Sequence, residues 1–247
     1  MQPRSLSLPS VPIPDYHDWH EVRVATCLAH LESHLVKLGA NGAKCLDLGH
    51  DPKMGAKLAS LGLIVTGNVH PSQPTPHVPW TLAPFDFEAG FPFPDGSFDI
   101  VTAFEVIEHV IGSPRVFLDE AFRVLRPGGL LYLGTPNVVS WAKVRRMLSY
   151  YHPYDAMPYS LTFGPRHPMC HIYEYDPWTL KQLVGSSGFD VVDCSTWDAY
   201  ASDPRGVRNA ALRVLVSASL FLTGFIKDAA LIWRRRGHQI GLVARKK

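Results

Sequence analysis

Two histidines stand where a side chain could move a proton. His109 follows an apolar run that ends at Phe104, and His171 lies in a long loop rich in aromatic residues and histidines. Histidine suits proton removal near neutral pH because its own pKa lies close to that pH. We therefore take His109 as the first candidate for a general base and His171 as the second. The alternative for His109 is a structural role in packing.

The same loop contains a spacing that resembles metal ligation. His167, Cys170 and His171 fall within five positions of one another. A metal centre needs ligands that converge from several segments and a supporting shell around them. Because no second cluster stands nearby in the sequence, we expect no metal site here.

The elements that must position these side chains alternate along the chain. Short apolar runs are typical of buried strands, and segments with a helical period or a capping residue are typical of helices. This alternation predicts an α/β fold, in which a doubly wound, parallel sheet carries helices on both faces. We expect strands at 44–48, 63–66, 98–104, 130–134, 189–193 and 239–244. We expect helices at 18–38, in a short segment before residue 60, and at 113–125, 139–150 and 176–187. The proline-rich stretch 71–95 is expected to be mostly loop.

In a doubly wound sheet, ligands bind beyond the carboxyl ends of the strands. The residues that follow predicted strand ends are therefore the first candidates for a binding site. They are residues 47–53, 67–70, Asp86, 105–109 and 135–137.

Residues 91–137 hold the most specific signal in the chain. They contain Phe98-Asp99-Ile100-Val101, Glu105-Val106-Ile107-Glu108-His109-Val110, Pro127-Gly128-Gly129 and Thr135-Pro136-Asn137. This stretch closely resembles the class I S-adenosylmethionine-dependent methyltransferases, in the branch that includes ubiquinone-type O-methyltransferases. The resemblance covers about residues 40–200 and the last strand. It implies a Rossmann-like, mostly parallel seven-stranded sheet and S-adenosyl-L-methionine as cofactor.

The resemblance also implies a glycine-rich loop after the first strand, here represented by Asp47, Gly49 and His50. Glycine allows backbone to approach the methionine end of the cofactor without a clash at Cβ. Only Gly49 stands where the family has glycine, since Asp51 and Lys53 replace the other two. The loop is therefore degenerate relative to the family.

Four further residues are implied as cofactor contacts. Asn68 stands where the family has an acidic residue that binds both ribose hydroxyls, and Asp86 with Phe87 resembles the segment that meets adenine. Glu105 faces the same crevice from the end of the predicted strand 98–104. An amide cannot offer the two oxygens of a carboxylate, and losing one such charge-assisted bond costs about 1–3 kcal/mol.

Two functions remain open at this point. One is a working S-adenosylmethionine-dependent methyltransferase that methylates a hydroxyl of a small-molecule, lipid-linked or glycan acceptor. The other is a non-catalytic protein of the same fold that acts as an interaction or membrane-associated subunit. A nicotinamide dehydrogenase is disfavoured, because it would also need a GxGxxG loop and a ribose acid.

We expect an extended arm at 1–16 and a single methyltransferase domain at 17–247, with a helical insertion at about 205–236. The acceptor pocket is expected to form from residues 139–175, because this loop is dense in tyrosine, and the insertion is a further candidate for its lining. The uncharged run 214–226 in the insertion is shorter than the roughly 20 residues that span a bilayer. It predicts either a packed helix pair or peripheral contact with a membrane surface.

The composition further limits the classes of protein to which this chain could belong. The net charge of +2, from 24 basic and 22 acidic residues, argues against a dedicated nucleic-acid binder. The four cysteines are scattered, and the prolines among the first fifteen residues interrupt any signal-peptide core. We therefore expect a cytoplasmic protein, and nothing in the sequence specifies an oligomeric state.

Overall fold

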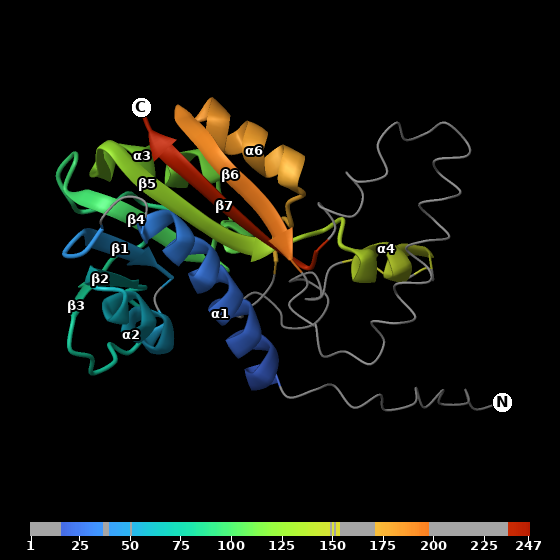
Figure 1. Ribbon diagram of the computed structural model, residues 1–247, viewed down its shortest axis with the longest axis horizontal. Helices are drawn as coiled ribbons and strands as arrows, with labels where there is room; N and C mark the ends of the chain where they lie inside the picture. The colour runs from blue at the N-terminus through green and yellow to red at the C-terminus, as the bar shows by residue number, and fades with distance from the viewer. Residues whose placement is uncertain are drawn as a thin grey trace.

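A seven-stranded sheet forms the centre of the fold, with strand order β3-β2-β1-β4-β5-β7-β6 (Figure 1). The computed structural model describes residues 16–36, 40–49, 51–148, 150, 152–153, 171–197 and 237–247. β7 runs antiparallel to both of its neighbours, and the other neighbouring strands pair in parallel. The strands are β1 (Lys44–Leu48), β2 (Ile64–Val69), β3 (Thr81–Pro84), β4 (Phe98–Phe104), β5 (Leu125–Pro136), β6 (Phe189–Trp197) and β7 (Gln239–Lys246). The predicted fold class is confirmed.

Helices cover both faces of the sheet. α1 and α2 pack on one face, where Leu31 and Leu58 meet Cys45 and Tyr132 of the sheet. α3 and α6 pack on the other face, where Leu118 contributes to the larger cluster of apolar side chains (Figure 1). The helices are α1 (Tyr16–Leu35), α2 (Pro52–Ser60), the short 3-10 helix η2 (Ile107–His109), α3 (Pro114–Val124), α4 (Trp141–Leu148) and α6 (Pro177–Ser186).

Capping side chains begin three of these helices, and the starts of α3 and α6 were predicted. Ser113 accepts a hydrogen bond from the backbone N–H of Arg115, and Asp176 accepts from the N–H groups of residues 178 and 179. Asp51 caps α2 in the same way through the N–H groups of residues 53 and 54. Asp51, which replaces a family glycine, therefore has a local structural role.

The stretch 71–95 is mostly loop, as predicted, but it contains the short strand β3. Thr81–Pro84 pairs in parallel with β2, from Thr66 opposite Thr81 to Val69 opposite Pro84. A four-residue strand at the sheet edge tolerates a terminal proline, because the missing N–H interrupts no central ladder. Because prolines surround this strand, the sequence there does not show a strand pattern.

Other strands are longer than their apolar runs. β2 continues to Val69, and β6 continues to Trp197, where it pairs with Gln239 of β7. β5 begins at Leu125, but its register against β4 shifts so that Ile100 lies opposite Leu130. Strand pairing extended these elements beyond what local hydrophobicity indicated.

Some predicted features fall on segments that the structure does not describe. Most of the arm expected at 1–16 and the whole insertion expected at 205–236 lie outside the described residues, as does most of the tyrosine-rich loop. α1 already includes Tyr16, the last residue assigned to the arm. Within the described ranges, no helix has both the length and the apolar character needed to cross a bilayer.

Arg123 fastens the chain before β4 onto α3. Its guanidinium donates to the carbonyl oxygens of Phe91 and Phe93 at 2.8 and 2.7 Å and to the carboxylates of Asp95 and Glu120, both at 2.8 Å. These contacts raise the pKa of Arg123, chiefly through Glu120. One side chain therefore fixes the entry to the most family-like segment.

We expect Arg123→Ala to lower the free energy of unfolding by about 2–4 kcal/mol, because four charge-assisted hydrogen bonds lose their donor. Urea unfolding measures this change. Arg115→Ala is the matched control, since its contact with Asp119 at 3.7 Å joins two side chains that are 50% and 56% exposed. The control should cost less than about 1 kcal/mol. Equal losses in the two variants would contradict the role given to Arg123.

Candidate functional site

The loops that follow β1 and β4 meet at the carboxyl edge of the sheet. Gly49 has a φ of +65°, and a Cβ added to it would lie 2.4 Å from Cγ2 of Val106. Both the backbone conformation and the space therefore require glycine at this position. His50, a predicted cofactor contact, lies outside the described residues.

Asp47 supports this edge from inside the sheet. Its side chain is 1% exposed, and its Oδ1 accepts a hydrogen bond from Oγ1 of Thr102 in β4 at 2.7 Å. The Asp47 side chain therefore joins β1 to β4, two residues before the turn at Gly49.

Asn68 uses its amide within the protein. Its oxygen accepts from the N–H of Gly49 at 3.4 Å, and its nitrogen donates to the carbonyl oxygen of Phe85 at 2.8 Å. The side chain is 2% exposed. Asn68 thus joins the ends of β1 and β2 to the segment after β3.

Asp86 and Phe87 follow β3 but lie in different surroundings. Asp86 is exposed and accepts a hydrogen bond from the N–H of Glu88 at 2.9 Å. Phe87 packs edge-on against Phe117 of α3, with ring centroids 5.9 Å apart. Asp86 therefore remains accessible to a ligand, and Phe87 contributes mainly to packing.

Glu105 forms a strained junction at the end of β4. It has a φ of +56°, which is uncommon for a residue other than glycine and is frequent at functional sites. Its carboxylate accepts from Arg23 of α1 at 2.9 Å and from Nε2 of Gln239 of β7 at 2.5 Å. The predicted cofactor contact Glu105 thus connects α1, β4 and β7.

Glu108 is a buried carboxyl group beside this junction. It is 0% exposed, and its Oε2 accepts a hydrogen bond from Oγ1 of Thr135 at 2.8 Å. Burial, followed by the charge of Glu105, raises the pKa of Glu108 well above its ordinary value. Its Oε1 is buried and has no hydrogen-bond partner among the described residues. The site therefore contains a buried carboxyl group with a raised pKa and one oxygen that lacks a hydrogen-bond partner.

The two candidate bases lie together. The rings of His109 and His171 are 5.0 Å apart between centroids and inclined by 77°. The chain around His171 is held in place because the N–H of Ile172 donates to the carbonyl oxygen of Glu108 at 2.7 Å. The fold thus brings together two histidines that are far apart in the sequence.

Glu174 orients His171. Its Oε1 lies 2.6 Å from Nδ1 of His171, and its Oε2 pairs with the ammonium group of Lys143 in α4. Glu174 and Lys143 are 1% and 2% exposed. Burial opposes ionisation of Glu174, but His171 and Lys143 outweigh it, so that its pKa is lowered. A buried carboxylate behind an imidazole is an arrangement that positions a general base.

Sequence reasoning missed the roles of Lys143, Glu174 and Arg23. Glu174 lies in the His171–Tyr175 stretch that supports the family resemblance, but Lys143 stands alone in a helical segment. No spacing rule joins Arg23 to Glu105 or Lys143 to Glu174. Only the packing of α1 and α4 against the strand ends creates these pairs.

Two side-chain groups in the described part of the chain could hold a metal ion. Glu108, His109 and His171 form one group, and His30, His34 and Asp193 form the other. In each group, the three ligand atoms lie within 4.8 Å of one another. His167 and Cys170, the spacing considered from sequence, lie outside the described residues.

Comparison with known sequences points to one family. Residues 68–133 match the model of a methyltransferase domain. A protein of Mycolicibacterium smegmatis, named as an S-adenosylmethionine-dependent methyltransferase, is 34% identical over 105 residues. The match covers 42% of this chain and 34% of that relative, so the chain spans about a third of its length.

Solved structures share the whole fold. An S-adenosylmethionine-dependent methyltransferase of Thermotoga maritima aligns with a TM-score of 0.56 at 16% identity, covering 94% of this chain and 95% of that one. The 1,6-didemethyltoxoflavin-N1-methyltransferase of Burkholderia thailandensis, with S-adenosylhomocysteine bound, gives a TM-score of 0.55 at 15% identity, covering 94% and 84%. At these sequence identities, the structural similarity establishes that this chain shares their fold.

Together these comparisons show that part of this chain is similar to S-adenosylmethionine-dependent methyltransferases and that the solved structures share its fold. They do not distinguish the ubiquinone-type O-methyltransferase branch from others.

We expect Glu108→Gln to stabilise the protein increasingly as pH rises above the ordinary pKa of a glutamate, about 4.3. The raised pKa means that the folded state holds a proton that the unfolded state releases above about pH 4.3. Unfolding therefore becomes easier with rising pH in the parent protein, and glutamine removes this dependence. Urea unfolding at several pH values measures the difference, with the exposed Glu32→Gln as control. A difference that does not change with pH would contradict the raised pKa of Glu108.

Proposed function

We propose that this chain is an S-adenosylmethionine-dependent methyltransferase that methylates a hydroxyl oxygen. The relative at 34% identity and the shared fold support methyl transfer. The single observation that carries the choice of a hydroxyl is the His109–His171 pair, backed by buried Glu174, at the edge where β1 and β4 end. A hydroxyl acceptor must lose a proton, whereas many nitrogen acceptors already carry a lone pair.

Two features of this edge fit the cofactor. Gly49 leaves bare backbone where the methionine end would approach, and Asp86 is exposed after β3 to meet the adenine amino group. Asp47 and Glu105 would shape the site through the loops they fix. Asn68 is committed to backbone partners, so the ribose must be held by other groups, among which His50 is a candidate.

The cofactor supplies a methyl group already activated by its sulfonium, so the protein mainly aligns the acceptor and removes a proton. Nδ1 of His171 contacts Glu174, which directs the other ring nitrogen, Nε2, to act as base. This contact favours His171 over His109 as the base, which reverses their order from the sequence. His109 then packs beside the base and helps to position it.

The acceptor we propose is a small-molecule, lipid-linked or glycan hydroxyl. The tyrosine-rich loop and the apolar segment at 205–236 support an acceptor with an apolar part, brought by peripheral contact with a membrane surface. Nucleic acid is not proposed as a partner, since the net charge of +2 is nearly balanced.

The degenerate loop supports one alternative, a non-catalytic subunit of the same fold. Asp51 and Lys53 stand in place of glycines, and the Asn68 amide is hydrogen-bonded to the carbonyl oxygen of Phe85. Calorimetric titration of the full chain with S-adenosylmethionine and S-adenosylhomocysteine separates the two functions.

We expect micromolar binding of both compounds and a loss of at least ten-fold in Gly49→Ala, because its Cβ would meet Val106. Gly128→Ala is the matched control: its φ of +76° is equally unusual, but nothing lies within 4 Å of the added Cβ. The control should bind within about three-fold of the parent. No binding up to millimolar concentration by the folded protein would favour the non-catalytic alternative.

We expect His171→Asn to lower methyl transfer by about a hundred-fold or more without changing the Kd for S-adenosylmethionine. Transfer of a radiolabelled methyl group to a panel of hydroxyl acceptors, including a polyprenyl-linked sugar and a quinone precursor, measures this loss. Glu174→Gln should reduce turnover less and shift the pH profile, since it acts through His171. His70→Asn, at an exposed site, is the control. Unchanged turnover in both His171→Asn and His109→Asn would rule out the histidine base.

A further inference from the structure

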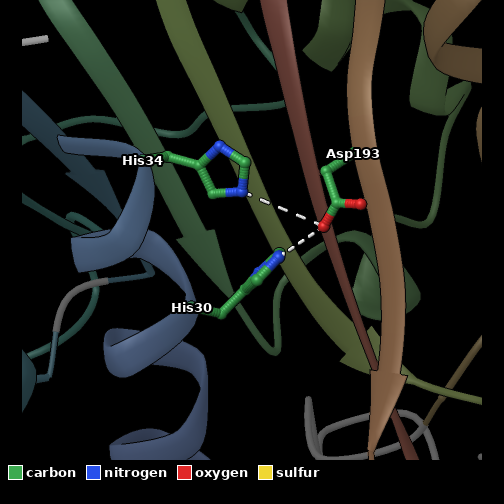
Figure 2. Close-up of side chains that lie close together, drawn as sticks. All are labelled: His30, His34 and Asp193. Carbon is green, nitrogen blue, oxygen red and sulfur yellow. Dashed lines mark hydrogen bonds and ion pairs between the residues drawn. The ribbon is translucent and has the colours of Figure 1, made fainter. Parts of the chain in front are cut away.

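A second cluster of ionisable groups, His30, His34 and Asp193, lies between α1 and β6 (Figure 2). His30 and His34 stand one helical turn apart on α1 and point toward Asp193 in the middle of β6. Nε2 of His30 lies 2.6 Å from Oδ2 of Asp193, and Nε2 of His34 lies 3.9 Å from the same oxygen. Residues four apart on a helix present their side chains on one face, so α1 offers both imidazoles together.

The cluster is sheltered but not sealed. The side chains of His30 and His34 are 13% and 15% exposed, and that of Asp193 is 35% exposed. They line a cavity of about 490 Å³ together with Ser33 and Arg245. An ion and its water could therefore reach the three ligand atoms from solvent.

Outer contacts hold two of the three side chains in orientation. Nδ1 of His30 lies 3.4 Å from the hydroxyl of Tyr132, and the hydroxyl of Ser195 donates to Oδ2 of Asp193 at 2.9 Å. Supporting contacts of this kind surround the first ligands of most protein metal sites.

The geometry suits a tetrahedral ion. Zinc bonds of about 2.0–2.1 Å to nitrogen and oxygen place neighbouring ligand atoms about 3.3 Å apart. The two distances to Asp193, 2.6 and 3.9 Å, lie on either side of this value, so shifts of less than about 1 Å would equalise them. Two imidazoles with one carboxylate favour zinc and its neighbours over calcium or magnesium.

We propose that His30, His34 and Asp193 bind a divalent transition-metal ion of the zinc class, with water completing its coordination. Arg245 lines the same cavity, so an anion such as chloride is a further suitable ligand. The ion would replace the direct His30–Asp193 contact and tether α1 to the edge strand β6. α1 also carries Arg23, which holds Glu105, so the tether would steady the junction at the end of β4.

Metal titration of the full chain tests this proposal. Tag-free protein is stripped with a chelator and titrated with ZnCl2 by calorimetry, and with CoCl2 while the visible absorption of tetrahedral cobalt is recorded. We expect one site with micromolar or tighter affinity and a rise in Tm on zinc addition. His34→Gln and Asp193→Asn should each weaken binding at least ten-fold and remove the rise in Tm.

Two controls locate the ion. His77→Gln, at an exposed histidine, should bind like the parent. His109→Gln should also retain binding, because it belongs to the other group of candidate ligands. Absence of binding, or equal affinity in His34→Gln and the parent, would overturn the proposal. Loss of binding in His109→Gln with retention in His34→Gln would assign the ion to the other group and overturn it as well. None of these readouts depends on methyl transfer.

Discussion

The turn at Glu105 is the constraint on which the site depends. Its left-handed backbone sends the chain from the end of β4 directly into η2, which delivers Glu108 and His109 to the carboxyl edge. Such a conformation costs of order 1 kcal/mol or more and persists only where surrounding contacts fix it. Arg23 of α1 and Gln239 of β7 supply those contacts. A helix near the start of the described chain and its last strand thus cooperate to place the residues after β4.

The site combines three carboxyl groups in different states. Glu105 is paired with a guanidinium, Glu108 is buried with a strongly raised pKa, and Glu174 is buried with a lowered pKa between an imidazole and an ammonium group. A buried ion pair adds little to stability over apolar packing, whereas a buried acid without full hydrogen bonding costs stability. These groups are therefore better explained by chemistry at the site than by folding.

The family resemblance acquires a physical meaning in the structure. Thr135 of the Thr-Pro-Asn stretch holds Glu108, and Asn137 donates to the carbonyl oxygen of Gly237 at 2.7 Å, just before β7. Gly49 is required by Val106, which belongs to the Glu105–Val110 stretch. Residues from segments that are far apart in the sequence thus contact one another at the carboxyl edge of the sheet. By contrast, the departures from the family at Asp51 and Asn68 have local roles, as a helix cap and as a link between strand ends.

The sequence by itself determined the order and type of most elements, because hydrophobic period, caps and turns act within a few residues. It also singled out His109, His171 and the Gly49 turn, since these follow from residue type and strand ends. It could not determine that Lys143 pairs with Glu174, that the Asn68 amide bonds to the backbone of Phe85, or that His30 and His34 face Asp193. Those partners come from elements far apart in the chain. Strand register and helix docking, which no local pattern encodes, decided which side chains meet.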